Sequence, residues 1–328
     1  MNETSPLLLS IVVPILNEAD NIDALLHEIE EVLPSVGGRS EVILVDDGSL
    51  DGSWQKIEEA SRRYRWVRGL RFLANRGQTA AMVAGIDAAR GKLVAFLDAD
   101  LQNDPHDIPK LMAPVLEGRA DLVCGWRAHR EDNLLLRTFP SKLANLLIRS
   151  AFRIEVHDLG CTLKVGRKVF LEDIQLYGEM HRFIPVYAQA QGARIAEETV
   201  NHRPRARGVS KYGLGRIWKV LVDLLTVKML NSYGSKPAYF FGKIGLTFFG
   251  LGLAAFALTA YRAVILGKVE ATPMIFIMLL MFITSLICMM SGLLAEINIR
   301  VLHQVGSRRS YRVIEEVGDP QATSVDQR

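Results

Sequence analysis

Cysteine is scarce in this chain of 328 residues: there are three, Cys124, Cys161 and Cys288, and they stand far apart. No C-x-x-C pair is present, which argues against a disulfide framework and a cysteine-based zinc site and is typical of a reducing compartment. The N-terminal segment MNETSPLLLSIVV has no basic region ahead of its apolar residues. We therefore expect no signal peptide.

Net charge is small as well, because 39 basic residues against 36 acidic ones leave only +3. Such a balance does not indicate nucleic acid as a partner. Two common signatures are also missing, because no G-x-G-x-x-G follows the first strand-like segment and VVPILNE (12–18) does not resemble a P-loop. Dinucleotide binding and ordinary kinase chemistry are therefore not expected.

Long apolar runs occur near the C-terminal end, at 239–266 and 273–295, and the second carries no charge. Each reaches the roughly 20 residues that cross a bilayer core. Basic residues flank the pair on one side, at Lys236 and within 300–312. The positive-inside rule then predicts a helical hairpin in the cell (inner) membrane, with everything before it and both termini in the cytoplasm.

Residues 7–126 alternate between strand-like and helical patterns. Near-continuous apolar strands separated by amphipathic helices favour an α/β domain with a Rossmann-like, mostly parallel sheet covered on both faces. Farther along, 215–230 is expected to lie as a basic amphipathic helix in the headgroup plane, with a core helix as the alternative. The tail after residue 312 is polar, and we expect its end to be disordered. The expected strands are 8–15, 41–45, 67–72, 93–97 and 121–125.

Acidic and amide side chains follow three of these strands. In parallel sheets, ligands bind at the carboxyl ends of the strands, so we expect these side chains to meet in one crevice. The three groups are Asn17-Glu18, Asp46-Asp47 and Asp98-Ala99-Asp100.

The D-x-D at 98–100 is weak as a motif alone, but its position after a buried strand strengthens it. Two carboxylates this close repel each other and need a cation or a special environment. They suit Mg²⁺ or Mn²⁺, which keep coordination positions open for the oxygens of a diphosphate. Gln102 could orient this site or ligate through its side-chain carbonyl. Asp104 precedes Pro105 and is expected to cap a helix.

The loop VDDGSLDGS (45–53) offers carboxylates and backbone amides to a nucleoside. One of Asp46 and Asp47 is expected to bind the ribose or base. Asp51 and Ser53 are expected to be turn and cap residues.

Seven segments together resemble the family-2 glycosyltransferases that charge polyprenyl phosphates, including dolichyl-phosphate mannose synthases and bacterial undecaprenyl-phosphate glucosyltransferases. The similarity covers about residues 7–235, and the two-helix tail matches the bacterial branch. It implies a GT-A fold, a nucleotide-diphosphate sugar donor, Mg²⁺ or Mn²⁺, and inversion at the anomeric carbon. In order, the segments are VVPILNEADN, VDDGSLDGS, NRGQTAAMVAGIDAARG, FLDADLQNDP, DLGCTLK, GEMHRFIP and RARGVSKYG.

The resemblance also implies roles for single residues. On the donor side it assigns nucleotide-sugar binding to Pro14, Asn17, Glu18, Asp46, Asp98, Ala99, Gln102, Arg205 and Lys211, and metal binding to Asp98, Asp100 and Gln102. The expected catalytic set is Asp100, Asp158, Arg127, Arg137, Ser141 and Arg205. Within it, Arg127, Arg137 and Ser141 resemble a group that receives the lipid phosphate, and Arg205 fits an arginine that closes over the phosphates. Asp158 and the pair His181-Arg182 would line the acceptor side, although Asp158 could instead be a cap or orient an arginine or the sugar. Arg130 and Arg203 are expected to be solvated charges or headgroup contacts.

A polyprenyl phosphate is already an anion at neutral pH, so its glycosylation does not require a base. The site must instead hold two anionic partners together, with a cation at the leaving diphosphate and arginines at the attacking phosphate. The chain has no Q-x-x-R-W after the D-x-D, which argues against a processive polymer synthase.

The expected organisation is a catalytic domain over 1–212, a juxtamembrane amphipathic helix over 213–235, two transmembrane helices within 236–300 and a cytoplasmic tail over 301–328. The expected reaction moves a hexose to a polyprenyl phosphate, with UDP-glucose as first candidate donor and GDP-mannose, N-acetylhexosamines or an aminoarabinose still open. Two alternatives remain: a family-2 transferase with another lipid or a protein acceptor, and an inactive membrane scaffold. A homo-oligomer through the hairpin and tail is compatible with either.

Overall fold

The computed structural model describes residues 6–128, 154–172, 174, 176, 180–203, 237–266, 273–305 and 311–318. The chain divides into two compact units. The first contains residues 1–224 together with 309–328, and the second contains 225–308. The residues that precede and follow the second unit in the chain therefore fold together.

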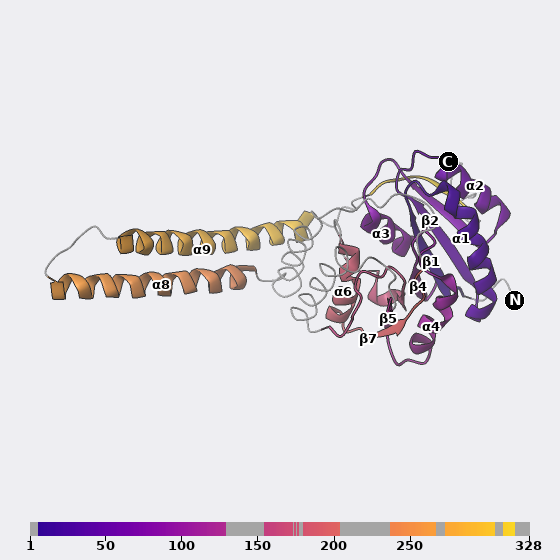
Figure 1. Cartoon of the computed structure of the whole chain (residues 1–328). Coiled ribbons are helices and arrows are strands. Elements are labelled where there is room, and N and C mark those ends of the chain that lie inside the picture. The colour runs from indigo at the N-terminus through magenta and orange to yellow at the C-terminus, as the bar shows by residue number, and fades with distance from the viewer. Residues whose placement is uncertain are drawn as a thin grey trace. The chain divides into compact units, whose positions relative to one another are not determined.

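The first unit is built on an eight-stranded sheet with the order β7-β5-β6-β4-β1-β2-β3-β8 (Figure 1). Only β6 and β8 run antiparallel to their neighbours, which confirms the prediction of a mostly parallel α/β sheet. The strands are β1 (Leu9–Ile15), β2 (Ser40–Asp46), β3 (Val67–Phe72), β4 (Leu93–Phe96), β5 (Leu122–Trp126), β6 (Lys164–Arg167), β7 (Ile195–Thr199) and β8 (Val313–Val317).

Helices cover both faces of this sheet (Figure 1). Alternate residues of β1 point to opposite faces. Leu9, Ile11 and Val13 join the core that also contains buried residues of α1, α2 and α4, while Val12 points to the opposite face, against α3. The helices α1 to α4 each follow a strand in the chain, as the sequence predicts. The bounds are α1 (Ala19–Val32), α2 (Ser53–Arg63), α3 (Gln78–Ala88), α4 (Ile108–Leu116) and α6 (Ile184–Ala190), with short 3-10 helices at η1 (Leu33–Val36), η2 (Pro105–Asp107), η3 (Lys168–Phe170) and η4 (Met180–Phe183).

Gly85 allows α3 to lie close to the sheet. A Cβ at this position would overlap the Val12 side chain. We expect Gly85→Val to lower the free energy of unfolding by about 1–3 kcal/mol, because overpacking forces side chains or backbone to shift. Chemical denaturation followed by tryptophan fluorescence measures this. Ala88→Val, at a half-buried position of the same helix, is the control, and equal midpoints for the two variants would contradict the close contact.

The strand β8 differs from the expectation of a polar tail. Its backbone pairs with β3, and its Glu316 carboxylate lies 2.9 Å from the guanidinium of Arg68. Arg68 is nearly buried and also bonds Glu41 at 2.9 Å. Tyr311, just before the strand, stacks on Phe72 with ring centroids 5.2 Å apart. The two glutamates of β8 form ion pairs with arginines of β3, more than 240 residues earlier in the chain. A local sequence pattern cannot predict such a pairing.

Where the structure describes it, the second unit has two long antiparallel helices, α8 (Pro237–Leu266) and α9 (Pro273–Val305). Glycines lie where the helices meet: a Cβ at Gly245 would be 3.1 Å from Met289, and one at Gly292 would be 3.2 Å from the Ala238 backbone. Small residues of this kind let apolar helices pack closely.

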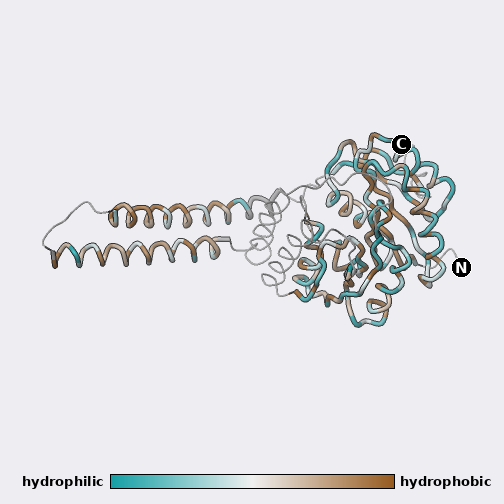
Figure 2. Tube along the Cα trace, viewed as in Figure 1, coloured by the Kyte–Doolittle hydropathy of each residue, from teal (hydrophilic) through white to brown (hydrophobic). Residues whose placement is uncertain are grey.

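Both helices are long and apolar enough to cross a membrane, with mean hydropathy 1.7 over Ala238–Ile265 and 2.5 over Pro273–Asn298 (Figure 2). Only 11% and 6% of their most apolar windows are buried, whereas core helices of a soluble protein would be mostly buried. The juxtamembrane amphipathic helix expected over 213–235 lies outside the described residues.

Candidate active site

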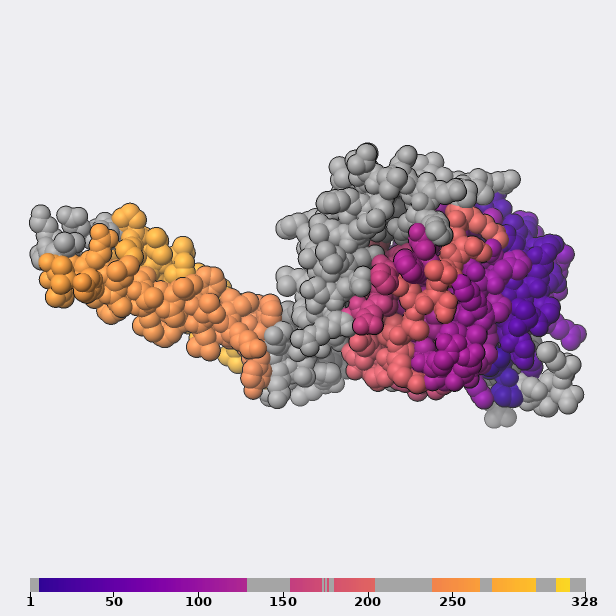
Figure 3. Space-filling model, turned by 60° about the horizontal axis from the view of Figure 1, so that its bottom comes forward, coloured from indigo at the N-terminus to yellow at the C-terminus, as the bar shows by residue number. Residues whose placement is uncertain are grey.

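Three neighbouring strands of the first unit end at the side chains that the sequence groups together. β4, β1 and β2 are adjacent and parallel, so their carboxyl ends lie at one edge of the sheet. Asp98 and Asn17 lie two residues after the ends of β4 and β1, and Asp47 directly follows β2. Figure 3 shows residues 154–203 packed against residues up to 128, so later segments add to this part of the unit.

The loops after β1 and β2 are tied together by hydrogen bonds. The Asn17 side chain accepts from the backbone N–H of Leu50 at 2.9 Å, and the Asn17 N–H donates to Ser49 at 2.9 Å. Asn17 has a positive φ of 56°, which an asparagine tolerates better than most residues. The Glu18 N–H donates to Ser53, whose hydroxyl donates to Asp51. Asn17 and Glu18 thus have a structural role in shaping this edge, and Asp51 is a turn residue as predicted.

Asp46 and Asp47 have different surroundings. Both carboxylate oxygens of Asp47 accept hydrogen bonds from backbone N–H groups, those of Arg76 at 2.6 Å and Gly77 at 2.9 Å. Burial raises the pKa of Asp47 despite these bonds. Asp46 is fully buried at the end of β2 and accepts one bond, from the Ser49 N–H. Its Oδ2 has no hydrogen bond. Of the two carboxylates, Asp46 is therefore the one with an oxygen left for another donor.

The D-x-D follows β4 after one residue, Leu97. Asp98 accepts from the side-chain amide of Gln78 at 2.9 Å and from that of Asn103 at 3.4 Å. Asp100 accepts from the backbone N–H of Gln102 at 3.2 Å. Ala99 between the two acids is buried. Gln78, the first residue of α3, lies in one of the seven segments named above. No local pattern marks it as a partner of Asp98, because that contact depends on how α3 packs.

Burial, reinforced by the charge of Asp100, raises the pKa of Asp98 to about 6. Thr162, Arg127 and Lys164 act in the opposite direction without cancelling this. The two neighbouring carboxylates therefore repel each other in a buried place, and a divalent cation would relieve this repulsion. Among the described residues, no group of three His, Cys, Asp or Glu side chains could hold a metal alone. Two carboxylates with open positions nonetheless fit Mg²⁺ or Mn²⁺, which commonly share their coordination with substrate phosphates.

Residues 201–203 fasten the end of β7 to the D-x-D loop. The Arg203 N–H donates to the Gln102 carbonyl at 2.9 Å, and His202 forms a β-bridge with Asn103. The Arg203 guanidinium pairs with Glu28 and Asp104, each at 2.8 Å. Arg203, expected to be a solvated charge or a headgroup contact, has a side chain that is 38% exposed, and two carboxylates distant in sequence also hold it. Asp104 also accepts from the His106 N–H, as expected of a cap before Pro105.

Arg127, directly after β5, forms a bidentate ion pair with Asp158. Its Nε lies 2.7 Å from Asp158 Oδ2 and its Nη2 lies 3.0 Å from Oδ1. Burial works against the positive charge, but the Asp158 bonds outweigh it and raise the pKa of Arg127. The carboxylate of Glu197 on β7 accepts the backbone N–H groups of His157 and Asp158 and so holds this loop. Of the alternatives for Asp158, the contacts favour orienting the arginine.

Two further side chains near this edge were missed or only loosely placed. Lys164 on β6 is 1% exposed, lies opposite Phe96 of β4 and donates to the Cys161 carbonyl. His181, expected on the acceptor side, is buried, and its Nδ1 lies 2.9 Å from the Thr79 hydroxyl of α3. Lys164 was missed because nothing in the sequence around it indicates that its side chain is buried.

Four expected site residues, Arg137, Ser141, Arg205 and Lys211, lie outside the described residues. Pro14 is half-buried within β1, opposite Val45.

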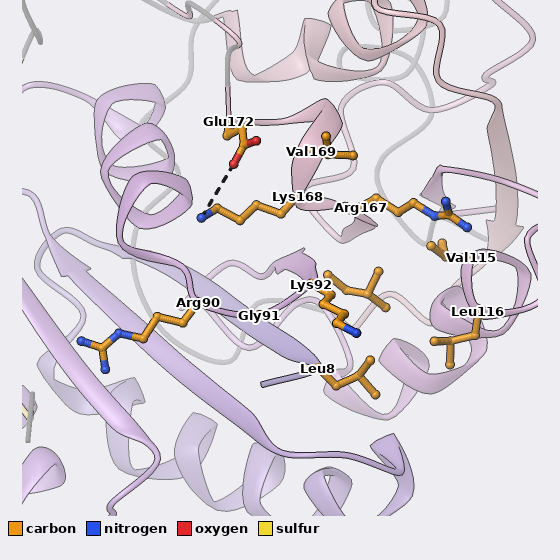
Figure 4. Close-up of a pocket in the computed structure, with 11 residues that line it drawn as sticks. Leu8, Arg90, Gly91, Lys92, Val115, Leu116, Arg167, Lys168, Val169 and Glu172 are labelled. Carbon is orange, nitrogen blue, oxygen red and sulfur yellow. Dashed lines mark ion pairs between the residues drawn. The ribbon is translucent and has the colours of Figure 1, made fainter. Parts of the chain in front are cut away.

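A cavity of about 530 Å³ lies at the opposite edge of the sheet, at the amino ends of β1 and β4 (Figure 4). Its lining includes Leu8, Lys92 and Arg167, as well as Lys168, whose ammonium lies 3.8 Å from Glu172. It contains none of the acidic strand-end residues, so it is separate from the candidate active site.

Comparison with known proteins gives consistent results. The model of the family described as glycosyl transferase family 2 matches residues 10–175. A dodecaprenyl-phosphate galacturonate synthase from Rhizobium johnstonii is 39% identical over 96% of this chain and 94% of its own length. An undecaprenyl-phosphate 4-deoxy-4-formamido-L-arabinose transferase from Aeromonas hydrophila is 33% identical over 95% and 94%. A solved glucosyl-3-phosphoglycerate synthase from Mycobacterium tuberculosis, in complex with Mn²⁺, UDP and glucosyl-3-phosphoglycerate, shares the fold with a TM-score of 0.52 at 19% identity, covering 67% of this chain and 79% of that one.

Proposed function

This chain belongs to glycosyltransferase family 2 and transfers a sugar to a polyprenyl phosphate, and from this premise we propose how its residues divide the work. Asp98 and Asp100 hold the divalent cation that meets the donor diphosphate. Asp46 forms the floor of the nucleoside side, and Arg127 receives the acceptor phosphate together with Arg137 and Ser141. Gln102 orients the loop that carries the carboxylates.

The observation that carries this proposal is the charge arrangement at one edge of the sheet. Burial and the neighbouring Asp100 raise the pKa of Asp98, while Arg127, held by Asp158 through two hydrogen bonds, lies near enough to lower that pKa. One part of the edge thus favours a cation with a diphosphate, and the other favours a second anion. A donor and a phosphorylated acceptor require this combination.

The acceptor phosphate needs no deprotonation, so the protein groups act by binding and orienting. Arg127 presents two N–H groups in a fixed fork toward Asp158 and keeps other N–H groups for an incoming phosphate. A divalent cation would supply charge neutralisation at the departing diphosphate. Holding both anions in line contributes much of the acceleration, because the reaction becomes effectively unimolecular. The product is a sugar phospholipid with inverted configuration at the anomeric carbon.

The sugar is best sought among those named for the relatives. Glucose on UDP was the first expectation from sequence, but the two full-length relatives are named for galacturonate and for formamido-arabinose. We place a nucleotide-linked galacturonate first because that relative is the more similar of the two. Formamido-arabinose comes second, and glucose and mannose follow.

We also propose that the hairpin spans the inner membrane with both ends in the cytoplasm. The segments before and after it fold into one unit, so both ends of the hairpin must emerge on the same side. The basic residues at Lys236 and within 300–312 mark that side as cytoplasmic. Cysteine-accessibility labelling of the connector 267–272 from outside the cell tests this orientation, and labelling only after permeabilisation would contradict it.

The test of function is transfer by the purified protein in lipid nanodiscs. Radiolabelled nucleotide sugars of the four kinds are offered with undecaprenyl phosphate, with diacylglycerol, and with either acceptor in excess chelator. Chelator-sensitive label on the polyprenyl phosphate is expected. Label on diacylglycerol alone would select the alternative acceptor, and no label with any acceptor would favour an inactive scaffold.

Arg205 gives a separate prediction, resting on its place in the chain. It follows Arg203, whose backbone is bonded to the D-x-D loop, and two residues span at most about 7 Å. Arg205→Ala is expected to cost at least about 2 kcal/mol of transition-state stabilisation, because a phosphate charge loses its partner. Steady-state kinetics measure kcat/KM, with Arg130→Ala as control. A change of less than about threefold at Arg205, roughly 0.6 kcal/mol, would count against its role.

A further inference from the structure

Three charged residues form a continuous row across adjacent strands at the donor side of the sheet. Asp46 on β2 is the register partner of Arg71 on β3, and Arg71 is the register partner of Glu315 on β8. Register partners point to the same face of a sheet. The row therefore connects the proposed nucleoside floor to the strand that the chain supplies after α9.

Arg71 lies between two carboxylates. Its Nε is 3.6 Å from Asp46 Oδ2, and its Nη1 is 3.3 Å from Glu315 Oε1 and 3.5 Å from Oε2. Its guanidinium carbon also lies 5.5 Å from the ring centroid of Trp54 in α2. Three separate elements thus determine where this side chain lies.

Exposure changes stepwise along the row. The Asp46 side chain is 0% exposed, that of Arg71 is 29% exposed and that of Glu315 is 45% exposed. A ligand approaching this edge therefore meets Arg71 before it can reach Asp46. At 3.6 Å, Arg71 Nε is too far from Asp46 Oδ2 to form a hydrogen bond, and this buried oxygen has no other hydrogen-bond partner. An unsatisfied buried carboxylate oxygen is costly, so binding of a ligand that donates a hydrogen bond to it is favourable.

We infer that Arg71 is a further donor-binding residue, that it forms the wall of the nucleoside pocket above Asp46, and that Glu315 positions it. The matching ligand is a nucleobase edge with an N–H beside a carbonyl oxygen: the carbonyl accepts from Arg71 and the N–H is directed to Asp46. Uracil and guanine both present such an edge. This inference rests on the proposed function, which places the donor nucleotide at this edge.

One consequence is that the last strand completes the donor side. β8 contributes no residue to the D-x-D, and an exposed ion pair such as Arg71–Glu315 adds little to stability. Its importance lies in restricting a long side chain that would otherwise sample many rotamers and would lose that freedom on binding. Losing Glu315 should therefore weaken donor binding while leaving the fold and the acceptor side unchanged.

The test measures binding of UDP and of GDP, each with Mn²⁺, to the full-length protein by titration calorimetry. Wild type is expected to bind one of them. Arg71→Ala should weaken that binding at least about tenfold, Arg71→Lys should recover part of the loss, and Glu315→Gln should weaken it severalfold. Ile314→Ala is the matched control, because Ile314 is exposed on the same strand and lies at the register shift between Val313 and Glu315.

Steady-state kinetics supply the second measurement. For Glu315→Gln, the KM for the donor should rise while the KM for the polyprenyl phosphate and the unfolding temperature stay at wild-type values. If wild type binds neither nucleotide, the proposed function fails and this inference fails with it. If wild type binds and the Arg71 and Glu315 variants bind equally well, the inference alone is overturned. A loss that Ile314→Ala shares would equally overturn it, because it would show a general effect of disturbing β8.

Discussion

Asp100→Ala is expected to reduce transfer by at least about a thousandfold, which corresponds to about 4 kcal/mol of lost transition-state stabilisation. The reason is that one of the two carboxylates able to hold a divalent cation is removed. The fold should not suffer, because Asp100 contributes repulsion that raises the pKa of Asp98. The free energy of unfolding should be unchanged or slightly higher, and the pKa of Asp98 should move back toward its ordinary value.

Two measurements separate this outcome from a general loss of negative charge. Turnover of labelled donor is compared with Mn²⁺ binding in the presence of nucleotide diphosphate, and both should fall together. Asp23→Ala is the control, because Asp23 is an exposed acid on α1 that pairs with Lys56. Wild-type turnover by Asp100→Ala, or full turnover of wild type in excess chelator, would refute the metal assignment.

The second large effect is expected at the Arg127–Asp158 pair. Arg127→Ala would leave the Asp158 carboxylate buried without its partner, so we expect a loss of about 3–5 kcal/mol in the free energy of unfolding as well as loss of transfer. Arg127→Lys keeps the charge but cannot reproduce the bidentate contact. It should fold and yet lower kcat/KM for the acceptor by at least about tenfold.

A paired replacement distinguishes a binding role from a structural one. Arg127→Met with Asp158→Leu removes both charges and fills similar volume, so stability should largely return. Activity should not return, because the acceptor phosphate still has no cation to receive it. Kinetics with varied polyprenyl phosphate and urea denaturation provide the two readouts. Recovery of transfer in the double variant would show that Arg127 acts only through stability.

Much of the fold could be predicted because strands and helices leave local patterns. The apolar segments at 8–15, 41–45, 67–72, 93–97 and 121–125 all contain strands of the sheet, and a helix follows each of the first four. The bounds differ by at most one residue at either end, since hydrogen bonding and not hydropathy sets the ends. The acidic strand ends could likewise be grouped, because parallel strands place their carboxyl ends at one edge.

The rest could not be predicted for a common reason. Two of the five residues of β8 are glutamates, and they are balanced by Arg68 and Arg71 from a strand far away in the chain. Arg203 was taken for a surface charge because the carboxylates of Glu28 and Asp104 that hold it are equally distant in sequence. In each case the sequence showed that the residue is charged, but it did not show which residue of opposite charge pairs with it.

Neighbours along the chain were enough to specify the first five strands, the turns after them, the two apolar helices and the chemical types gathered at the site. Hydrophobic periodicity and turn chemistry operate over a few residues, so a linear reading captures them. Only the tertiary structure determines which carboxylate pairs with which cation. Ion pairs and hydrogen bonds require distances of a few ångströms, here between residues that are far apart in sequence. Asp158 beside Arg127, and Arg71 between Asp46 and Glu315, therefore became visible only in three dimensions.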